Sequence, residues 1–352
     1  MTGTRLGFFT RLLDAAPAAV RYRNALEQIE LAERLGFDSA WVAQHHFRAG
    51  EGGLPAPFVF LSHAAARTSR IRLATGIVTL PLENPVRVAE DAAVLDLLSG
   101  GRLEVGVGSG GTPSSFAAFG QRSEDRSATY DRHLAVLKDA WRGDPLTDAG
   151  DSLYPAGGSL LDRVWQATFS VAGGRRAGLA GDGLMLSRTQ PRPAEHPDAT
   201  LADLQVPIIE AYLDALPDGV PPRILASRSV FVSDDRGEAR RLAADGLGRA
   251  AAHFASIGQP AADDSLDGLI RAFDQHLGEP DDVAESLAAD PSLAHATDVA
   301  VQVHSVDPPH PFVLRSIELF VERVAPLLGW RDAPGADSVP VPAAPTLEGR
   351  TA

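Results

Sequence analysis

Cysteine is absent from the 352 residues of this chain, and lysine occurs once, as Lys138. The lack of cysteine excludes disulfide bonds, zinc–thiolate centres, iron–sulfur clusters and thiol nucleophiles. Because arginine carries nearly all the positive charge, we interpret the single lysine as a matter of genome composition without functional weight. Long apolar runs that would span a membrane are lacking. The opening MTGTRLGFF lacks the features of a secretory signal, so the sequence predicts a cytoplasmic protein.

Positive charge is also scarce, since the formal net charge is -14. Nucleic acids and anionic membranes require a basic face, so they are not expected partners. One small phosphate is still permitted, because a few backbone N–H groups can hold it. Hydrophobic residues make up 44% and charged residues 22%, which is typical of a globular core.

Short β-rich runs alternate with longer helical runs along the chain. The first four β-rich runs begin 31 to 34 residues apart, which is about the length of one β-helix unit. Eight such runs followed by helical sequence predict a (β/α)8 TIM barrel within the α/β class rather than an open sheet. The predicted strands are Arg5–Phe9, Ser39–Ala43, Ile71–Thr79, Arg102–Gly108, Val164–Ser170, Gly183–Ser187, Ile224–Val232 and Asp298–His304.

Three connections exceed the length of a plain barrel connection: Gly143–Arg163, Thr189–Arg223 and Ser233–Thr297. We interpret them as insertions in a single domain that spans residues 1–330. The tail Arg331–Ala352 is rich in proline, alanine and glycine, so it is expected to be disordered or to wrap around a neighbour.

The active site of a (β/α)8 barrel lies at the carboxyl ends of its strands, and the fifth predicted strand ends in a candidate anion site. Ser170 supplies a hydroxyl, Gly173 and Gly174 let the backbone approach closely, and Arg175 and Arg176 add charge. A helix that begins at such a turn favours a phosphate. The alternative is an ordinary glycine-rich turn between a strand and a helix.

The fourth predicted strand ends in glycines that imitate a dinucleotide fingerprint. Gly106, Gly108 and Gly111 fit G-x-G-x-x-G, but three strands precede them, whereas the fingerprint belongs to the first unit of a Rossmann domain. We interpret these glycines as room for a flat ligand; a tight turn that needs glycine would leave the same pattern.

The second predicted strand ends in two adjacent histidines, within WVAQHHFRAG (residues 41–50). Neighbouring residues of an extended segment point apart, so His45 and His46 are not expected to bind one metal ion, and no metal site is predicted. One of the two should face the barrel mouth, where an imidazole can transfer protons near neutral pH. A structural histidine with satisfied hydrogen bonds is the other interpretation.

Four segments resemble the bacterial luciferase-like flavin monooxygenases. They are GFDSAWVAQHHF, the run IRLATGIVTLPLENPVRVAEDAAVLDLLSGGRLEVGVGSG, AGLAGDGLMLSR and LRSIELFVERVAPLLGW. The segments occur in the order of that family, and the resemblance covers Arg5 to Trp330. It implies a (β/α)8 barrel with insertions, a flavin cofactor and a homodimer.

The resemblance also implies roles for individual residues. His45 matches the histidine that faces the flavin and assists proton transfer. Gly76 and Ile77 match a pair joined by a cis peptide beneath the isoalloxazine ring. Ser170 and the pair Gly173-Gly174 match the turn that holds the phosphate, in agreement with the analysis of the fifth strand.

The chain departs from the family pattern at three positions. Gln44 replaces the usual glutamate, while Gly108 and Ser109 replace the Cys-Arg pair of the luciferases. Light emission is therefore not expected, and Arg175 or Arg176 is a candidate replacement for the missing phosphate-binding arginine.

The resemblance implies a two-component monooxygenase in which a separate reductase supplies reduced FMN. Oxygen would add to the reduced flavin to give a peroxyflavin, and this must be kept from water until it attacks a small organic substrate. The long segments Gly143–Arg163 and Ser233–Thr297 are candidate lids. The sequence does not identify the substrate.

Three other interpretations stay open. Relatives on the same fold transfer hydride with the deazaflavin F420, whose acidic tail would need a local basic patch in so acidic a chain. A flavin-binding protein without turnover is the second alternative. A hydrolase with paired carboxylates ranks last, because no acidic residue stands immediately at the ends of strands two to six.

Overall fold

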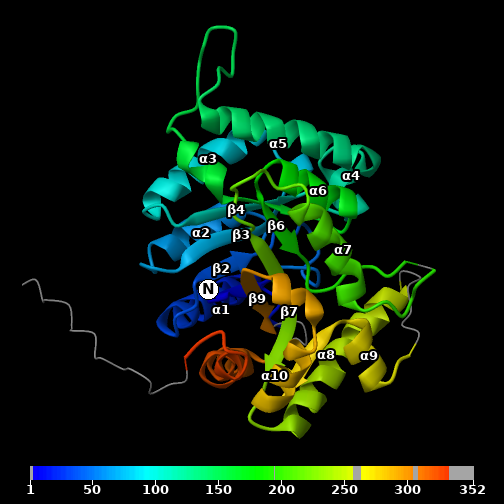
Figure 1. Cartoon of the computed structure of the whole chain (residues 1–352). Helices are drawn as coiled ribbons and strands as arrows, with labels where there is room; N and C mark the ends of the chain where they lie inside the picture. Colours follow the sequence, from blue (N-terminus) through cyan, green and yellow to red (C-terminus); the bar gives the residue numbers. More distant parts are fainter. Residues whose placement is uncertain (1–2, 194, 257–262, 304–307, 333–352) are drawn as a thin grey trace, which may run out of the picture.

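The chain forms a closed parallel β-barrel surrounded by helices, as the computed structural model shows for residues 3–193, 195–256, 263–303 and 308–332 (Figure 1). Eight strands pair in the order β6-β5-β4-β3-β2-β1-β9-β7, and pairing of β6 with β7 closes the ring. These strands are β1 Arg5–Thr10, β2 Ser39–Val42, β3 Arg72–Thr79, β4 Leu103–Gly108, β5 Val164–Ala167, β6 Gly183–Leu186, β7 Ile224–Val232 and β9 Asp298–Gln302. The predicted (β/α)8 barrel is confirmed, and every predicted strand overlaps an observed one; residue 304 of the last prediction lies outside the described residues.

A ninth strand, β8 (Gln275–Gly278), lies outside the ring and was not among the predicted strands. It pairs with the second half of β7, Ser229–Val232, whereas the first half of β7, Ile224–Ala226, pairs with β6. β7 is therefore nine residues long and buried throughout, because it both closes the barrel and supports the segment between β7 and β9.

Helices cover the outside of the barrel, and Figure 1 shows α8, α9 and α10 gathered beside β7, away from α3 and α5. The helices are α1 Ala18–Arg34, α2 Pro57–Ala65, α3 Pro85–Leu98, α4 Pro113–Ala118, α5 Arg126–Arg142, α6 Val171–Leu179, α7 Leu201–Leu213, α8 Arg236–Ser256, α9 Leu266–Ala272, α10 Pro280–Ala288, α11 His310–Leu319 and α12 Ala325–Leu327. Within the described ranges, none of these helices has the length and apolar composition required to cross a bilayer. Of the tail predicted to be disordered, only Arg331 and Asp332 lie within the described residues.

The segment Gly143–Arg163 is not a lid, contrary to the sequence interpretation. It leads into the amino end of β5 and, in Figure 1, projects from the end of α5. Arg163 at its end donates to Asp96 at 2.6 Å and to the Gly101 carbonyl at 2.8 Å, just before β4. The segment is thus anchored at the amino ends of the strands, while an active site of this fold lies at the carboxyl ends.

Two tryptophans fill the centre of the barrel. The rings of Trp41 on β2 and Trp165 on β5 meet edge to face with centroids 5.6 Å apart. Their indole N–H groups donate to Ser39 and Glu104, each at 2.8 Å, so the buried donors are satisfied. Met185 and Leu225 pack against the tryptophans and form the base of the space above.

Candidate active site

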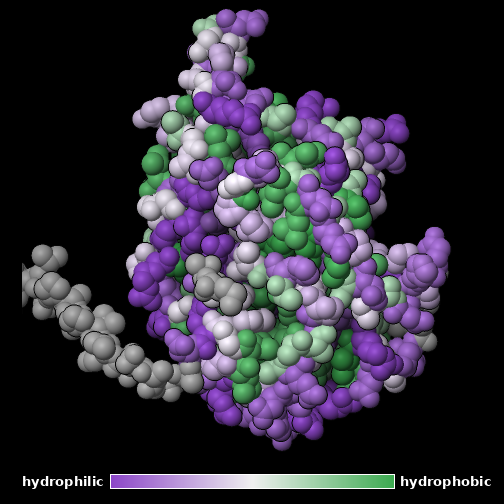
Figure 2. Space-filling view, in the orientation of Figure 1, coloured by the Kyte–Doolittle hydropathy of each residue, from purple (hydrophilic) through white to green (hydrophobic). Residues whose placement is uncertain are grey.

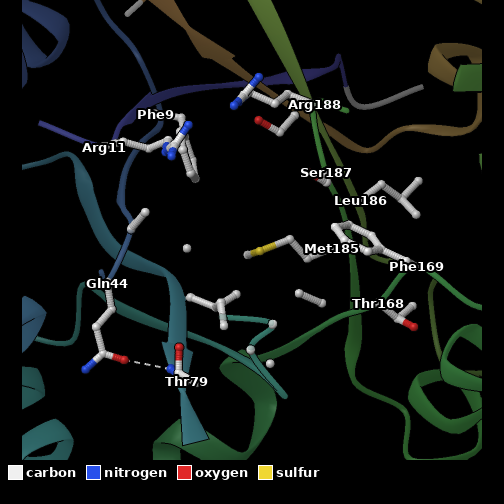
Figure 3. A pocket seen from close by; sticks show the side chains of 18 of the residues that line it. Phe9, Arg11, Gln44, Thr79, Thr168, Phe169, Met185, Leu186, Ser187 and Arg188 are labelled. Atoms are coloured by element: carbon white, nitrogen blue, oxygen red, sulfur yellow. Dashed lines mark hydrogen bonds between the residues drawn. The ribbon is translucent and has the colours of Figure 1, made fainter. Parts of the chain in front are cut away.

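A cavity of about 410 Å³ opens at the carboxyl ends of the barrel strands (Figure 3). Each of the eight barrel strands, or the residues that directly follow it, contributes to the lining. The candidate residues that sequence analysis placed in this lining are His45, Gly76, Ile77, Gly108 and Ser109. The structure therefore brings residues from β2, β3 and β4 together around one space, where a barrel enzyme has its active site.

The wall formed by β3 and β4 is flat because glycine stands where a side chain would block it. The Gly76–Ile77 peptide is cis, as the resemblance implies. A Cβ atom on Gly76 would lie 2.7 Å from the Phe9 ring, and one on Gly108 would lie 2.7 Å from Ile77. Gly111, the last glycine of the imitated fingerprint, also lines the cavity, while Gly106 packs against the Thr75 carbonyl. At Gly76 and Gly108 the cavity wall is thus formed by backbone without a side chain.

His45 and His46 point into different spaces, as expected for neighbours in an extended segment. His45 lines the main cavity and also a smaller adjoining one, whereas His46 lines only the smaller one and packs edge to face on Phe119 at 4.9 Å. Among the described residues, the buried Nδ1 of His45 has no hydrogen-bond partner. Burial, followed by the positive charges of Arg11 and Arg188, lowers the pKa of His45 to about 3. The imidazole is therefore neutral across the physiological range, and its Nδ1 is buried beside Gly52 while the residue lines the cavity.

Gln44 joins the histidine segment to β3 and to the turn that follows it. Its carbonyl oxygen accepts from the Thr79 amide at 2.7 Å, and its amide nitrogen donates to Glu83 at 2.7 Å and to the Pro55 carbonyl at 3.2 Å. A glutamate at this position would keep the first contact but would place a carboxylate against Glu83. Glu83 thus supplies a negative charge that acts on His46. The Gln44 side chain connects Glu83 to the backbone amide of Thr79.

Restoring the usual glutamate with Gln44→Glu should therefore destabilise the protein by about 2 kcal/mol at neutral pH, since a buried donor is lost and two carboxylates face each other. Urea unfolding monitored by circular dichroism measures this change. The deficit should shrink as the pH falls and one carboxyl takes up a proton.

The double variant Gln44→Glu with Glu83→Gln provides the control, because it reverses the direction of the same hydrogen bond. It should recover most of the lost stability. If the single and double variants are equally destabilised, the contact between residues 44 and 83 is not the cause.

The turn after β5 begins helix α6 beside the cavity. The Ser170 hydroxyl accepts from the Gly173 amide at 3.1 Å, and Thr168, which lines the cavity, accepts from the Ser170 amide at 3.1 Å. A Cβ atom on Gly174 would lie 2.5 Å from the Ile208 carbonyl, so this glycine lets α6 approach α7. Gly173 similarly has no space for a side chain beside Thr168. Ser170, Gly173 and Gly174 thus build a tight helix start, although they are not themselves among the residues that line the cavity.

The two arginines of α6 differ in their surroundings. Arg176 donates to Gln166 at 3.0 Å, stacks over the Tyr130 ring at 4.7 Å and lies 3.4 Å from Asp131. These contacts hold its guanidinium against β5 and α5 rather than at the turn. Arg175 is exposed. Figure 2 shows apolar side chains on the surface around α6, in the part of the molecule that also carries the exposed Val171.

Two arginines that sequence analysis did not select line the cavity. Arg11 follows β1 and Arg188 follows β6, and Figure 3 shows their guanidinium groups on the same side of the space. Their position directly after a strand could have identified them as residues of the site. For Arg188 this position was visible in the sequence. Elsewhere in the described ranges, no three histidine or carboxylate side chains converge as a metal ion would require.

Comparison with known proteins places this geometry in a family. A sequence model of the family described as luciferase-like monooxygenase matches residues 5–307. The 4-hydroxyprotoasukamycin monooxygenase of Streptomyces nodosus subsp. asukaensis is 36% identical over 190 residues, which are 51% of each protein. An F420-dependent glucose-6-phosphate dehydrogenase of Beutenbergia cavernae is 30% identical over 239 residues, 61% of this chain and 69% of that one. The chain matches about half the length of the first of these relatives.

Solved structures share the whole fold. Monooxygenase RslO1 from Streptomyces bottropensis superposes with a TM-score of 0.72 at 26% identity, covering 92% of this chain and 99% of that one. The oxygenating constituent of 3,6-diketocamphane monooxygenase from Pseudomonas putida, in complex with FMN, gives a TM-score of 0.72 at 19% identity over 92% and 98%. Monooxygenases and F420-dependent oxidoreductases both occur among the similar proteins.

Proposed function

The chain belongs to the luciferase-like monooxygenase family, and from this premise we propose that it is the oxygenase component of a two-component, FMN-dependent monooxygenase. One observation carries the proposal. A cavity wall with glycines at the ends of β3 and β4 stands next to a tight helix start at the end of β5, the neighbouring strand, beside the cavity. A flat ring with a phosphate tail requires these two features side by side.

The residues present fit FMN without the Cys-Arg pair of the luciferases. The glycines Gly76 and Gly108 leave a place for the ring. The Gly173 amide donates to the Ser170 hydroxyl, which leaves the Val171 and Ala172 amides without partners within helix α6. Together with Ser170 and the exposed Arg175 they are suited to hold a phosphate. We omit Arg176 from this set, because its contacts direct it to Gln166 and Tyr130.

When bound, reduced FMN would supply the electrons that activate O2, from which one oxygen atom enters the organic substrate. The chain's own contribution is to exclude water and to move protons. The neutral His45 lines the cavity, and we assign to it the transfer of a proton there. Phe9, Ile77, Met185 and Leu225 give the cavity an apolar lining that keeps the reacting groups away from bulk water.

An anaerobic experiment tests the proposal. The protein is mixed with reduced FMN and then with oxygenated buffer, while the flavin absorbance is followed rapidly. The proposal expects reduced FMN to bind and its reoxidation to follow a time course different from that of free FMN. A time course identical to the protein-free control would refute it. The same titration with reduced F420 decides between the two cofactors, and tight binding of F420 alone would assign hydride transfer instead. A bound flavin that never delivers oxygen to any substrate would indicate a non-catalytic flavin-binding protein.

We further propose that the chain forms a homodimer through α2 and α3. The neighbouring positions Val94, Leu97 and Leu98 form one face of α3, and Leu97 and Leu98 are 65% and 67% exposed. Val59 on α2 is 73% exposed. Helix α2 packs against α3, and exposed apolar side chains on neighbouring helices are typical of an interface between protein subunits.

The double substitution of Leu97→Glu and Leu98→Glu should therefore weaken dimerisation by about 100-fold or more, since charges would be buried against apolar surface. Sedimentation velocity over a range of protein concentrations measures this shift. Leu327→Glu on α12, where the leucine is 57% exposed, is the matched control and should leave the sedimentation unchanged. If the wild-type protein sediments as a monomer at all concentrations, the interface is refuted.

A further inference from the structure

The cavity has two chemically different halves. The half at β3, β4 and β5 is the one in which we place FMN. The other half is formed by β1, β9, β7 and β6, which are consecutive neighbours in the ring. Its polar lining is Arg11, Ser187, Arg188, Ser227 and Gln302. No carboxylate side chain belongs to the cavity lining within the described part of the chain, so its charged groups are cationic.

Arg11 and Arg188 are held in place from outside the cavity. Arg11 donates to the backbone carbonyl of Glu51, and Arg188 donates to the Ser229 hydroxyl at 3.3 Å. A guanidinium carries five N–H donors in a rigid fork, so a contact along one edge is compatible with a bidentate carboxylate along another. In Figure 3 both guanidinium groups lie along one side of the space, with Phe9 next to Arg11.

Ser227 on β7 adds an independent observation. Its side chain is 5% exposed and lines the cavity between the strands that carry the two arginines. Its hydroxyl has no hydrogen-bond partner among the described residues. A buried hydroxyl without a partner is costly, and a ligand that supplies an acceptor atom would relieve this cost.

The positive charges of Arg11 and Arg188 act on His45, which we place at the reaction centre. Both guanidinium groups contribute to the lowered pKa of His45, after the effect of burial. The whole chain carries a net charge of -14, so attraction of an anion must come from such a local cluster.

We propose that Arg11 and Arg188 bind the carboxylate of an organic acid that is the substrate, with Ser227 as a further hydrogen-bond donor. This proposal rests on the proposed function, because it takes the other half of the cavity to be the flavin site. Phe9, Met185 and Leu225, on β1, β6 and β7, add apolar surface to the same half and form a site for the apolar body of the acid. The charged end is thereby fixed on one side, while the body of the acid lies toward the glycine wall and His45.

The test is a binding experiment that needs neither flavin nor turnover. Straight-chain and aromatic monocarboxylic acids are titrated into the full-length protein by calorimetry, each against the carboxamide of the same skeleton. The proteins are wild type, Arg11→Gln, Arg188→Gln, Ser227→Ala and the control Arg122→Gln, whose exposed side chain lies far along the sequence in the loop before α5. Thermal unfolding verifies that each variant is folded, and Arg11→Lys and Arg188→Lys replace any glutamine variant that is not.

At least one acid should bind about tenfold or more tightly than its amide, since a charge-assisted pair is stronger than a neutral hydrogen bond. Each arginine-to-glutamine variant should lower the affinity for that acid by about 10-fold to 100-fold. The affinity for the amide should stay within about threefold of the wild-type value. Arg122→Gln should bind like wild type.

Three outcomes would overturn the proposal. The first is that no acid in the panel is preferred over its amide, and the second is that the preference survives in both arginine variants. A third is that the same variants weaken reduced FMN as strongly as the acid, which would assign the arginines to the cofactor. If an acid binds as expected but reduced FMN does not bind at all, the anion site stands and the proposed function fails, so the two failures are distinguishable.

Discussion

Replacing Lys138 with methionine is expected to lower the free energy of unfolding by about 3–5 kcal/mol at neutral pH. The single lysine of the chain lies on α5 with its side chain 12% exposed, and it donates to both carboxylate oxygens of Asp182 at 2.6 Å. Asp182 is 2% exposed and also accepts from Gln166 at 2.7 Å. Removing the ammonium group would leave a buried carboxylate with only neutral donors. Lys138 is therefore structurally important, although the scarcity of lysine in the sequence was interpreted only as a matter of genome composition.

The sign of the pH dependence identifies the cause. Burial already raises the pKa of Asp182, and Lys138 opposes this effect. In Lys138→Met the pKa rises further, so the cost of the charged carboxylate is greatest at neutral and alkaline pH. This destabilisation should decrease as the pH falls. It should vanish below the pKa that Asp182 has in the unfolded chain, because the carboxyl is then protonated in both the folded and the unfolded state. Urea unfolding curves between acid and neutral pH measure this trend.

Two variants control the prediction. Arg142→Met on the same helix breaks an exposed pair with Asp139, and it should cost less than about 1 kcal/mol. Lys138→Met combined with Asp182→Asn should recover most of the stability, because no buried charge remains. Equal losses in Lys138→Met and Arg142→Met would show that burial of the pair contributes nothing.

Replacing His45 with glutamine should slow the return of oxidised FMN after oxygen is added by about 100-fold, the scale on which a lost proton-transfer group acts. Glutamine is similar in size, so the cavity stays closed, but it has no basic nitrogen. Stopped-flow absorbance of the anaerobic complex measures the rate. His46→Gln is the matched control and should stay within about threefold of wild type, because His46 faces the adjoining space and not the main cavity.

The pH profile adds an independent test of the same role. Because the pKa of His45 is lowered to about 3, its protonation should cause no change in the wild-type rate near pH 6.5. The pH–rate profiles of wild type and His45→Gln should therefore have the same shape around that pH. The same shift affects stability. The unfolded chain takes up a proton at His45 as the pH falls below about 6.5, whereas the folded chain does not, so folding stability decreases on the acid side. His45→Gln should remove this part of the decrease, and an unchanged acid dependence would show that the imidazole is not buried as described.

The sequence predicted the barrel well because the ring strands are rich in apolar and β-branched residues and alternate with helical segments, as in ILASRSVFV of β7. It missed β8, whose four residues, QHLG, include two polar ones and match no strand period. The lid expected from Gly143–Arg163 failed for a topological reason. Sequence length shows that a connection is long but not at which end of the barrel it lies, which depends on whether it follows or precedes a strand.

Of the residues predicted for the site, His45, Gly76 and Gly108 line the cavity, whereas Ser170 lies beside it and its role stays a prediction. Arg11 and Arg188 are 177 positions apart in the numbering, and only closure of the ring places β1 and β6 on the same side of one space. Gln44 was interpreted as the loss of a charge. The structure shows instead that the neighbouring carboxylate of Glu83 stands beside the amide, a relation that local sequence does not reveal.

The pairing of β1 with β9 has a consequence for biosynthesis. Arg5 at the start of β1 bonds to Asp298 at the start of β9, which is 293 residues away. At ribosomal rates of about 5–20 residues per second, β1 waits roughly 15–60 seconds for its partner strand to be made. During that interval one edge of β1 has no neighbour and can pair with another nascent chain. Slower translation should therefore lower the yield of native protein, and a chaperone that shields the first strand should raise it.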